Sequence, residues 1–282
     1  MKKVRLKQAD KARVQIAVNA VVLFSVLFSL LSVFITVLNS LKYQYDIYTG
    51  IFSLPTAGIA WSNFSTAFGV VSGYLLNSVF VALVSAVVTV FCGSVVAYVF
   101  SRKEFFGKEF FFMLYIAVLL MPSITGLSVL YQFVIELGLV DRYFAIWIPL
   151  LSSGQVGVVF LFRTFFSQQP GSVFEAAKID GANDVNIYLK FVLPMALPIL
   201  MLNFVSIFTS QYNDFLWPSL VIKTDEKMLL MTILQRNAEK FEGKEQGVNY
   251  AMYLISGIPL IFTTAISLRY FKDGDFAAGM KL

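Results

Sequence analysis

Long stretches of apolar residues, separated by short polar segments, dominate the chain. A helix that crosses the ~30 Å hydrocarbon core of a bilayer needs about 20 apolar residues, and its backbone polar groups must be paired within the segment. Stretches without Asp, Glu, Lys or Arg therefore locate candidate membrane helices. They predict six spans, at about 14–41, 74–100, 110–135, 143–165, 191–216 and 247–271.

The stretch before the second span also lacks charge, but Gly50, Pro55, Gly58 and the segment 61–63 predict turns there. Only about residues 74–100 of this stretch are therefore expected to span the membrane. Proline removes a helix hydrogen bond and permits a kink. Six prolines lie in or beside the apolar runs: Pro122, Pro149, Pro194, Pro198, Pro218 and Pro259.

The composition supports a membrane protein and excludes several chemistries. Of 282 residues, 58% are hydrophobic and only 14% are charged, whereas a soluble domain carries roughly 25% charged residues. The fold class predicted is all-α, a polytopic membrane protein with six transmembrane helices. Because the chain has no His and one Cys, Cys92, it has neither a Ser-His-Asp triad nor a His-ligated metal site.

Basic residues flank the apolar runs and predict the orientation. Loops rich in Lys and Arg stay in the cytoplasm, and an inside N-terminus places fifteen of them on the inner side against seven on the outer side. Both termini are therefore expected in the cytoplasm, with a tail over 1–13 and another over 272–282. The basic residues form no single cluster, so nucleic acid is not an expected partner.

The centres of the predicted spans hold no ionisable residue, although such residues usually mark ion or proton pathways. This weighs against an ion-coupled secondary carrier, which stays open as the alternative because backbone carbonyls also bind sodium. Uncharged polar side chains are candidates to line a hydrophilic substrate path, and hydrogen bonding between helices is the alternative role. These candidates are Asn77, Gln132, Gln155, Asn203, Ser206 and Gln211.

The polar loop over 170–190 predicts two short helices on the cytoplasmic side. Ser172 and Glu175 have the spacing of a capping box, which predicts a helix start there. Gly181 suits the left-handed turn that ends a helix, and Asn183 suits the cap of the next one. A helix, a sharp turn and a second helix outside the bilayer predict a protruding docking element.

This loop resembles the EAA loop of permease subunits from binding-protein-dependent ABC importers. The resemblance rests on Glu175-Ala176-Ala177, Gly181 and, after nine intervening residues, Phe191-Val192-Leu193-Pro194, where the family usually has Ile in place of Phe191. Other segments are similar to the smaller permease of maltose-type carbohydrate importers. They are Asn39-Ser40-Leu41-Lys42, Asn77-Ser78, Ala97-Tyr98, Ser101-Arg102, Leu137-Gly138-Leu139, Asn213-Asp214-Phe215-Leu216-Trp217-Pro218 and Gly279-Met280-Lys281.

The resemblance implies a type I ABC importer transmembrane domain over 14–271 that forms half of the path for a sugar or oligosaccharide in a bacterial cell membrane. It implies a second homologous permease in a heterodimer, a cytoplasmic ATPase dimer and an extracytoplasmic sugar-binding protein. The outer segments 42–72 and 219–246 are expected to face the binding protein. The residues implied to couple to the ATPase are Glu175, Ala176, Ala177, Asp180 and Gly181.

The sequence itself places ATP hydrolysis on another chain, because it has no G-x-x-x-x-G-K-[ST] phosphate loop. The chain is therefore expected to be non-catalytic and to bind no cofactor, with ATP and Mg²⁺ held by the partner ATPase. Two alternatives stay open. An ion-coupled carrier predicts transport that depends on a gradient, and a membrane scaffold predicts no flux of its own.

Overall fold

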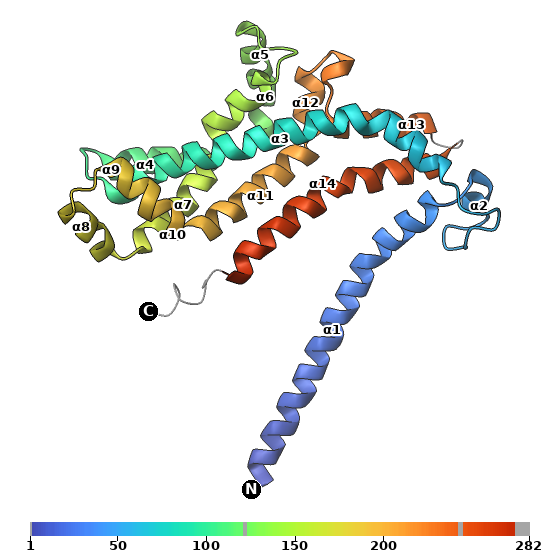
Figure 1. The fold of residues 1–282 in the computed structure, drawn as a ribbon, viewed down its shortest axis with the longest axis horizontal. Helices are drawn as coiled ribbons and strands as arrows, with labels where there is room; N and C mark the ends of the chain where they lie inside the picture. The colour runs from blue at the N-terminus through green and yellow to red at the C-terminus, as the bar shows by residue number, and fades with distance from the viewer. Residues whose placement is uncertain (1, 121–122, 242–244, 274–282) are drawn as a thin grey trace. The chain divides into compact units, whose positions relative to one another are not determined.

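The computed structural model describes residues 2–120, 123–241 and 245–273, and these ranges are helical without a strand (Figure 1). Pro122 and the segment Gly279-Met280-Lys281 lie outside the described residues. The chain divides into two compact units, the first formed by 1–70 with 236–255 and the second by 71–235 with 256–282. Three helices contribute to both units: α3 Ser62–Arg102, α13 Leu230–Phe241 and α14 Gln246–Asp273.

The remaining helices belong to one unit each. The first unit holds α1 Lys2–Ser40 and α2 Gln44–Thr49. The second holds α4 Lys108–Ala117, α5 Leu127–Glu136, α6 Phe144–Pro149, α7 Val156–Gln168, α8 Gly171–Ile179, α9 Asp184–Ile187, α10 Leu193–Met195, α11 Leu197–Asn213 and α12 Leu216–Val221. Short 3-10 turns lie at Val118–Leu120, Ser123–Gly126 and Asp225–Lys227, and π-helical turns lie at Leu150–Gly154 and Tyr188–Val192.

Three of the described helices are long and apolar enough to cross a bilayer, and they are Val14–Ser40, Ser62–Arg102 and Gln246–Leu268. Two bent pairs reach the same length together, Phe144–Ser152 with Val156–Gln168 at 47° and Asp184–Met195 with Leu197–Asn213 at 77°. The described residues therefore offer three to five candidate spans.

Prolines account for both bends. Pro149 precedes the π-helical turn of the first pair, and Pro194 and Pro198 flank the bend of the second pair at Ala196. A proline ring lacks the N–H that would continue the helix ladder. Pro259, by contrast, lies inside the continuous helix α14.

The structure bears on two of the predicted spans. Helix α3 begins at Ser62, after the turns at Gly50 and Gly58, so the predicted span 74–100 lies inside a longer helix. The predicted span 110–135 is not one continuous helix. It contains α4 and α5 with 3-10 turns between them, and Gly126 is the N-cap of α5.

A buried lysine organises the first unit at the end of α1. The Lys42 side chain is 0% exposed, and its Nζ donates to Asn39 Oδ1 at 3.1 Å and to the carbonyls of Gly50 and Ile51 at 3.0 Å each. Burial lowers the pKa of Lys42, and Asp46 opposes this shift. A cation at a helix C-terminus is favourable, so Lys42 fastens the chain that follows α1 to the helix end.

In the second unit, Asp141 ties the connection between α5 and α6 to the segment that follows α12. Its carboxylate accepts hydrogen bonds from the backbone N–H of Lys223 at 3.0 Å and of Thr224 at 2.9 Å, and Lys227 Nζ lies 2.9 Å away. Asp141 also adopts a φ of 63°, which is unusual for a residue other than glycine. These bonds hold two distant loops together.

The pH dependence of stability is expected to follow this carboxylate. The hydrogen bond from the Thr224 hydroxyl, followed by those from Thr224 N–H and Lys227, holds the pKa of Asp141 well below its usual range. Since the unfolded pKa is about 3.9, the stabilisation is fully present above about pH 4 and is lost as the pH falls toward the lower folded pKa.

Thermal unfolding of the purified protein between pH 7 and pH 3 measures this effect. Asp141→Asn keeps a residue that tolerates positive φ but removes the charge, so its destabilisation relative to wild type should shrink at the acid end. Glu136→Gln, which removes an exposed carboxylate from α5, serves as the control. The prediction would be contradicted if Asp141→Asn were destabilised relative to wild type by the same amount at pH 7 and at pH 3.

Candidate functional site

The docking loop, defined here as residues 170–190, contains the predicted helix, turn and second helix. Helix α8 begins at Gly171 after Pro170, which is the N-cap and makes no side-chain cap. The predicted capping box at Ser172 and Glu175 is therefore wrong, because the N-cap lies two positions earlier, at Pro170, and Ser172 is inside the first turn. Proline fixes the extended chain that enters the helix instead.

The turn after α8 is built as predicted. Gly181 has φ +81°, its N–H donates to Lys178 O at 3.0 Å, and the N–H of Ala182 donates to Ala177 O at 2.9 Å. These two bonds form a Schellman motif, which satisfies the last carbonyls of a helix. Asn183 then caps α9 by accepting from Asn186 N–H at 2.8 Å, which confirms its predicted role.

The two faces of α8 differ in exposure. Glu175, Ala176, Asp180 and Gly181 are exposed. Ala177 is instead buried with Phe174 in the core of the second unit. The structure therefore brings four of the five predicted coupling residues to the surface and gives Ala177 a packing role. Apolar side chains also reach the surface beside them, with Ile179 86% exposed.

The back of the docking loop is attached to the end of α3 by Arg102. Its guanidinium donates to Gln169 O at 2.8 Å and to Phe166 O, and it lies 4.3 Å from the centroid of the Phe174 ring. Lys103 forms an ion pair with Asp184. From the end of α3, one arginine thus contacts both the end of α7 and the buried side of α8.

A second attachment lies on α9 and the π-helical turn that follows it. Tyr188 is buried against Tyr98, with ring centroids 5.3 Å apart, and its hydroxyl lies 2.6 Å from Ser94 Oγ. Sequence reasoning missed Arg102, Ser94 and Tyr188 as parts of this site. The sequence drew attention to one of them, Arg102, because the segment Ser101-Arg102 is similar to carbohydrate permeases.

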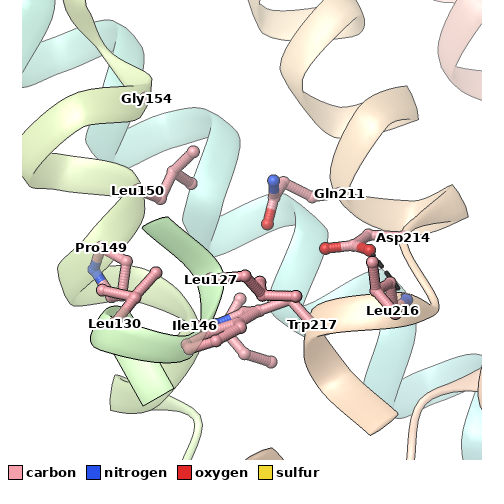
Figure 2. Close-up of a pocket in the computed structure, with 10 residues that line it drawn as sticks. All are labelled: Leu127, Leu130, Ile146, Pro149, Leu150, Gly154, Gln211, Asp214, Leu216 and Trp217. Carbon is pink, nitrogen blue, oxygen red and sulfur yellow. Dashed lines mark hydrogen bonds between the residues drawn. The ribbon is translucent and has the colours of Figure 1, made fainter. Parts of the chain in front are cut away.

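A cavity of about 410 Å³ lies in the second unit between α5, α6 and α11 with α12 (Figure 2). Its wall is mostly apolar, with Leu127, Leu130, Ile146, Pro149, Leu150, Gly154 and Leu216. Three other lining side chains carry polar groups, and they are the Gln211 carboxamide, the Asp214 carboxylate and the Trp217 indole. The Trp217 Nε1 donates to Ala145 O at 2.9 Å, which fixes the ring in the wall.

Of the six predicted path residues, the structure places only Gln211 in this cavity. Asn77 donates to the carbonyls of Glu226 and Met228 at 2.8 and 3.1 Å, and buried Asn203 donates to Ile199 O at 2.9 Å. Gln132 and Ser206 are exposed elsewhere, and Gln155 precedes α7 with a buried Oε1 that has no hydrogen bond. Sequence reasoning missed Asp214 and Trp217 as cavity residues.

The structure thus shows a helical protein with three to five candidate membrane spans among its described residues, a cavity among helices of the second unit and a helix–turn–helix over 170–190. The family described as "Binding-protein-dependent transport system inner membrane component" matches residues 89–274. Because this match covers most of the chain, the protein belongs to that family. It is a permease subunit of an ABC importer and a component of the inner membrane.

Individual relatives extend this similarity over more of the chain. The probable ABC transporter permease protein YurM of Bacillus subtilis is 29% identical over 248 residues, which cover 87% of this chain and 81% of that protein. The arabinooligosaccharides transport system permease protein AraQ of Halalkalibacterium halodurans is 28% identical over 231 residues, with 82% and 78% covered.

A solved structure shares the fold. It is a crystal structure of a bacterial ABC transporter involved in the import of the acidic polysaccharide alginate. The match has a TM-score of 0.79 at 25% identity and covers 92% of this chain and 97% of that one. The all-helical permease fold predicted from the sequence is therefore confirmed.

Proposed function

We propose that this permease forms half of the translocation path for a sugar or oligosaccharide and pairs with a second, homologous permease in a heterodimer. An extracytoplasmic binding protein delivers the sugar, and a cytoplasmic ATPase dimer drives alternating access. The relative named for arabinooligosaccharides supports a carbohydrate substrate, and so does a cavity that offers hydrogen-bonding groups beside an indole ring.

The observation that carries the proposal is the docking loop. Its exposed side presents Glu175, Ala176 and the tight turn at Gly181, while its buried side is fixed to α3 through Arg102. A short exposed helix can bind in a groove on a partner. Closure of the ATPase dimer would move α8, and the packed contact with α3 would pass this movement to the membrane helices.

The proposed topology has six spans and both termini in the cytoplasm of a bacterial cell. The domain boundaries are those expected above, with tails over 1–13 and 272–282 and a transmembrane domain over 14–271. The docking loop then lies in the cytoplasm, and the segments 42–72 and 219–246 face the binding protein. The excess of basic residues in the inner segments supports this orientation.

The proposed permease is non-catalytic and binds no cofactor itself. ATP and Mg²⁺ belong to the partner ATPase, in line with the missing phosphate loop in the sequence. Among the described residues, no three His, Cys, Asp or Glu side chains are grouped to hold a metal ion.

Co-purification from the native membrane tests the proposal. We expect mass spectrometry of the gently solubilised wild-type complex to recover an ABC ATPase and a second permease. Glu175→Lys should lose the ATPase but keep the permease, because it reverses an exposed charge on the docking loop without touching the core. ATP-dependent uptake of labelled sugar should fall by at least about tenfold, which corresponds to about 1.4 kcal/mol.

The matched control is Glu136→Lys, which makes the same charge reversal at an exposed position on α5. It should keep both partners and normal uptake. Normal uptake by Glu175→Lys would overturn the docking role. Repeated recovery of the chain alone, with transport that follows an ion gradient, would favour the carrier instead.

A further inference from the structure

The charge of the cavity in Figure 2 comes from one residue. Among the described residues that line it, Asp214 is the only ionisable one, and no Lys or Arg is present. Gln211, one turn earlier on α11, is the other polar group of the same wall. A ligand in this cavity therefore meets a carboxylate and a carboxamide, and none of the described lining residues supplies a cation to neutralise an anionic group.

The backbone around Asp214 fixes this carboxylate. Asp214 directly follows α11, and its Oδ1 accepts a hydrogen bond from Leu216 N–H at 3.1 Å. The C-terminal end of a helix carries a partial negative charge from its carbonyls, and the last turn of α11 holds no basic residue. The helix end and the carboxylate therefore both contribute negative potential at one side of the cavity.

We infer that Asp214 determines the substrate class of this permease: the cavity accepts uncharged, hydroxyl-rich sugars and rejects sugars that carry carboxylate or phosphate groups. This inference rests on the proposed function. A carboxylate accepts short hydrogen bonds from sugar hydroxyls, Gln211 can donate and accept, and Trp217 offers an aromatic surface for the apolar face of a sugar ring. An anionic sugar would meet repulsion from the half-buried Asp214 carboxylate.

The reactivity of a thiol in the cavity wall reports the electrostatic potential at that wall. This measurement does not require the substrate to be known. In the complete importer, with Cys92 replaced by serine, Gln211→Cys supplies a thiol in the cavity wall. It is labelled with a cationic and an anionic methanethiosulfonate reagent of similar size. Adding Asp214→Asn should lower the ratio of the cationic to the anionic rate by about tenfold, because the nearby carboxylate attracts the cationic reagent and repels the anionic one. Adding Glu136→Gln, which removes a charge outside the cavity wall, should leave the ratio unchanged.

Binding of two trisaccharides to the same solubilised complex tests the substrate class. Maltotriose serves as the neutral probe and trigalacturonate as the acidic probe, with calorimetry as the readout. Wild type should bind only the neutral probe, and Asp214→Asn should gain affinity for the acidic probe by about tenfold.

The outcomes separate the inference from the proposed function. Equal binding of both trisaccharides by wild type, or an unchanged reagent ratio in Asp214→Asn, would overturn charge selection and leave a sugar importer intact. A changed ratio with no binding of either trisaccharide would overturn the sugar cavity, and with it the inference about substrate class that rests on it.

Discussion

Gly181→Pro is expected to abolish ATP-driven uptake while the protein still inserts into the membrane. Gly181 has φ +81° and donates its N–H to Lys178 O at 3.0 Å. Proline is restricted to a φ of about −65° and has no N–H, so the Schellman turn cannot form. The cost is about 3 kcal/mol or more, and it falls on the element that orients α8 relative to α9.

The control for this variant is Gly171→Pro. Gly171 is the first residue of α8, a position where proline is well tolerated because its N–H has no partner within the helix. Both variants should be recovered from the membrane in similar amounts, but only Gly181→Pro should lose the ATPase and the uptake of labelled sugar. Uptake by Gly181→Pro at the level of Gly171→Pro would show that the turn is not needed for coupling.

Arg102→Ala is expected to uncouple ATP hydrolysis from transport. The change removes the donor to the carbonyls of Phe166 and Gln169 and the cation above the Phe174 ring. Carbonyls left without a partner cost about 1 to 3 kcal/mol, and the lost ring contact about 0.5 to 2 kcal/mol. Helix α8 would then move without pulling α3, so sugar transported per ATP hydrolysed should fall by about tenfold.

Two further substitutions distinguish this role from simple destabilisation. Arg102→Lys keeps the charge but not the forked donor, so it should restore only part of the coupling. Lys108→Ala removes a cation that pairs with exposed Glu104 and should change neither coupling nor thermal stability. Transport per ATP that is normal in Arg102→Ala, at whatever stability, would contradict the mechanical role of this residue.

Features that depend on local chemistry were predictable from the sequence. Uncharged apolar runs identify a helical membrane protein, because each span satisfies its own backbone hydrogen bonds. The left-handed turn at Gly181 and the cap at Asn183 were also predictable, since only neighbouring residues take part. The prolines that flank the sharp bend at Ala196 act through their own missing donors in the same way.

Tertiary contacts decided the rest of the site. Sequence spacing predicts a capping box at Ser172, but α8 starts at Gly171 without a side-chain cap. Nothing in the sequence predicts that Ala177 is buried, yet it packs beside Phe174 in the core. Arg102 becomes the link to the docking loop only because the end of α7 lies within reach of its guanidinium.

The residues of the cavity also show that local sequence predicts some features and tertiary contacts decide others. An uncharged polar residue in an apolar helix signals either a path or a bond between helices, and the sequence offers no means of choosing. The fold directs Asn77 to loop carbonyls and Asn203 to its own helix, and it leaves Gln211 beside Asp214 in the cavity. The sequence by itself determined the class of protein and the turn of the docking loop, because both depend on neighbours along the chain. Only the tertiary structure decided which side chains share a wall or a contact, because these partners lie far apart in the sequence.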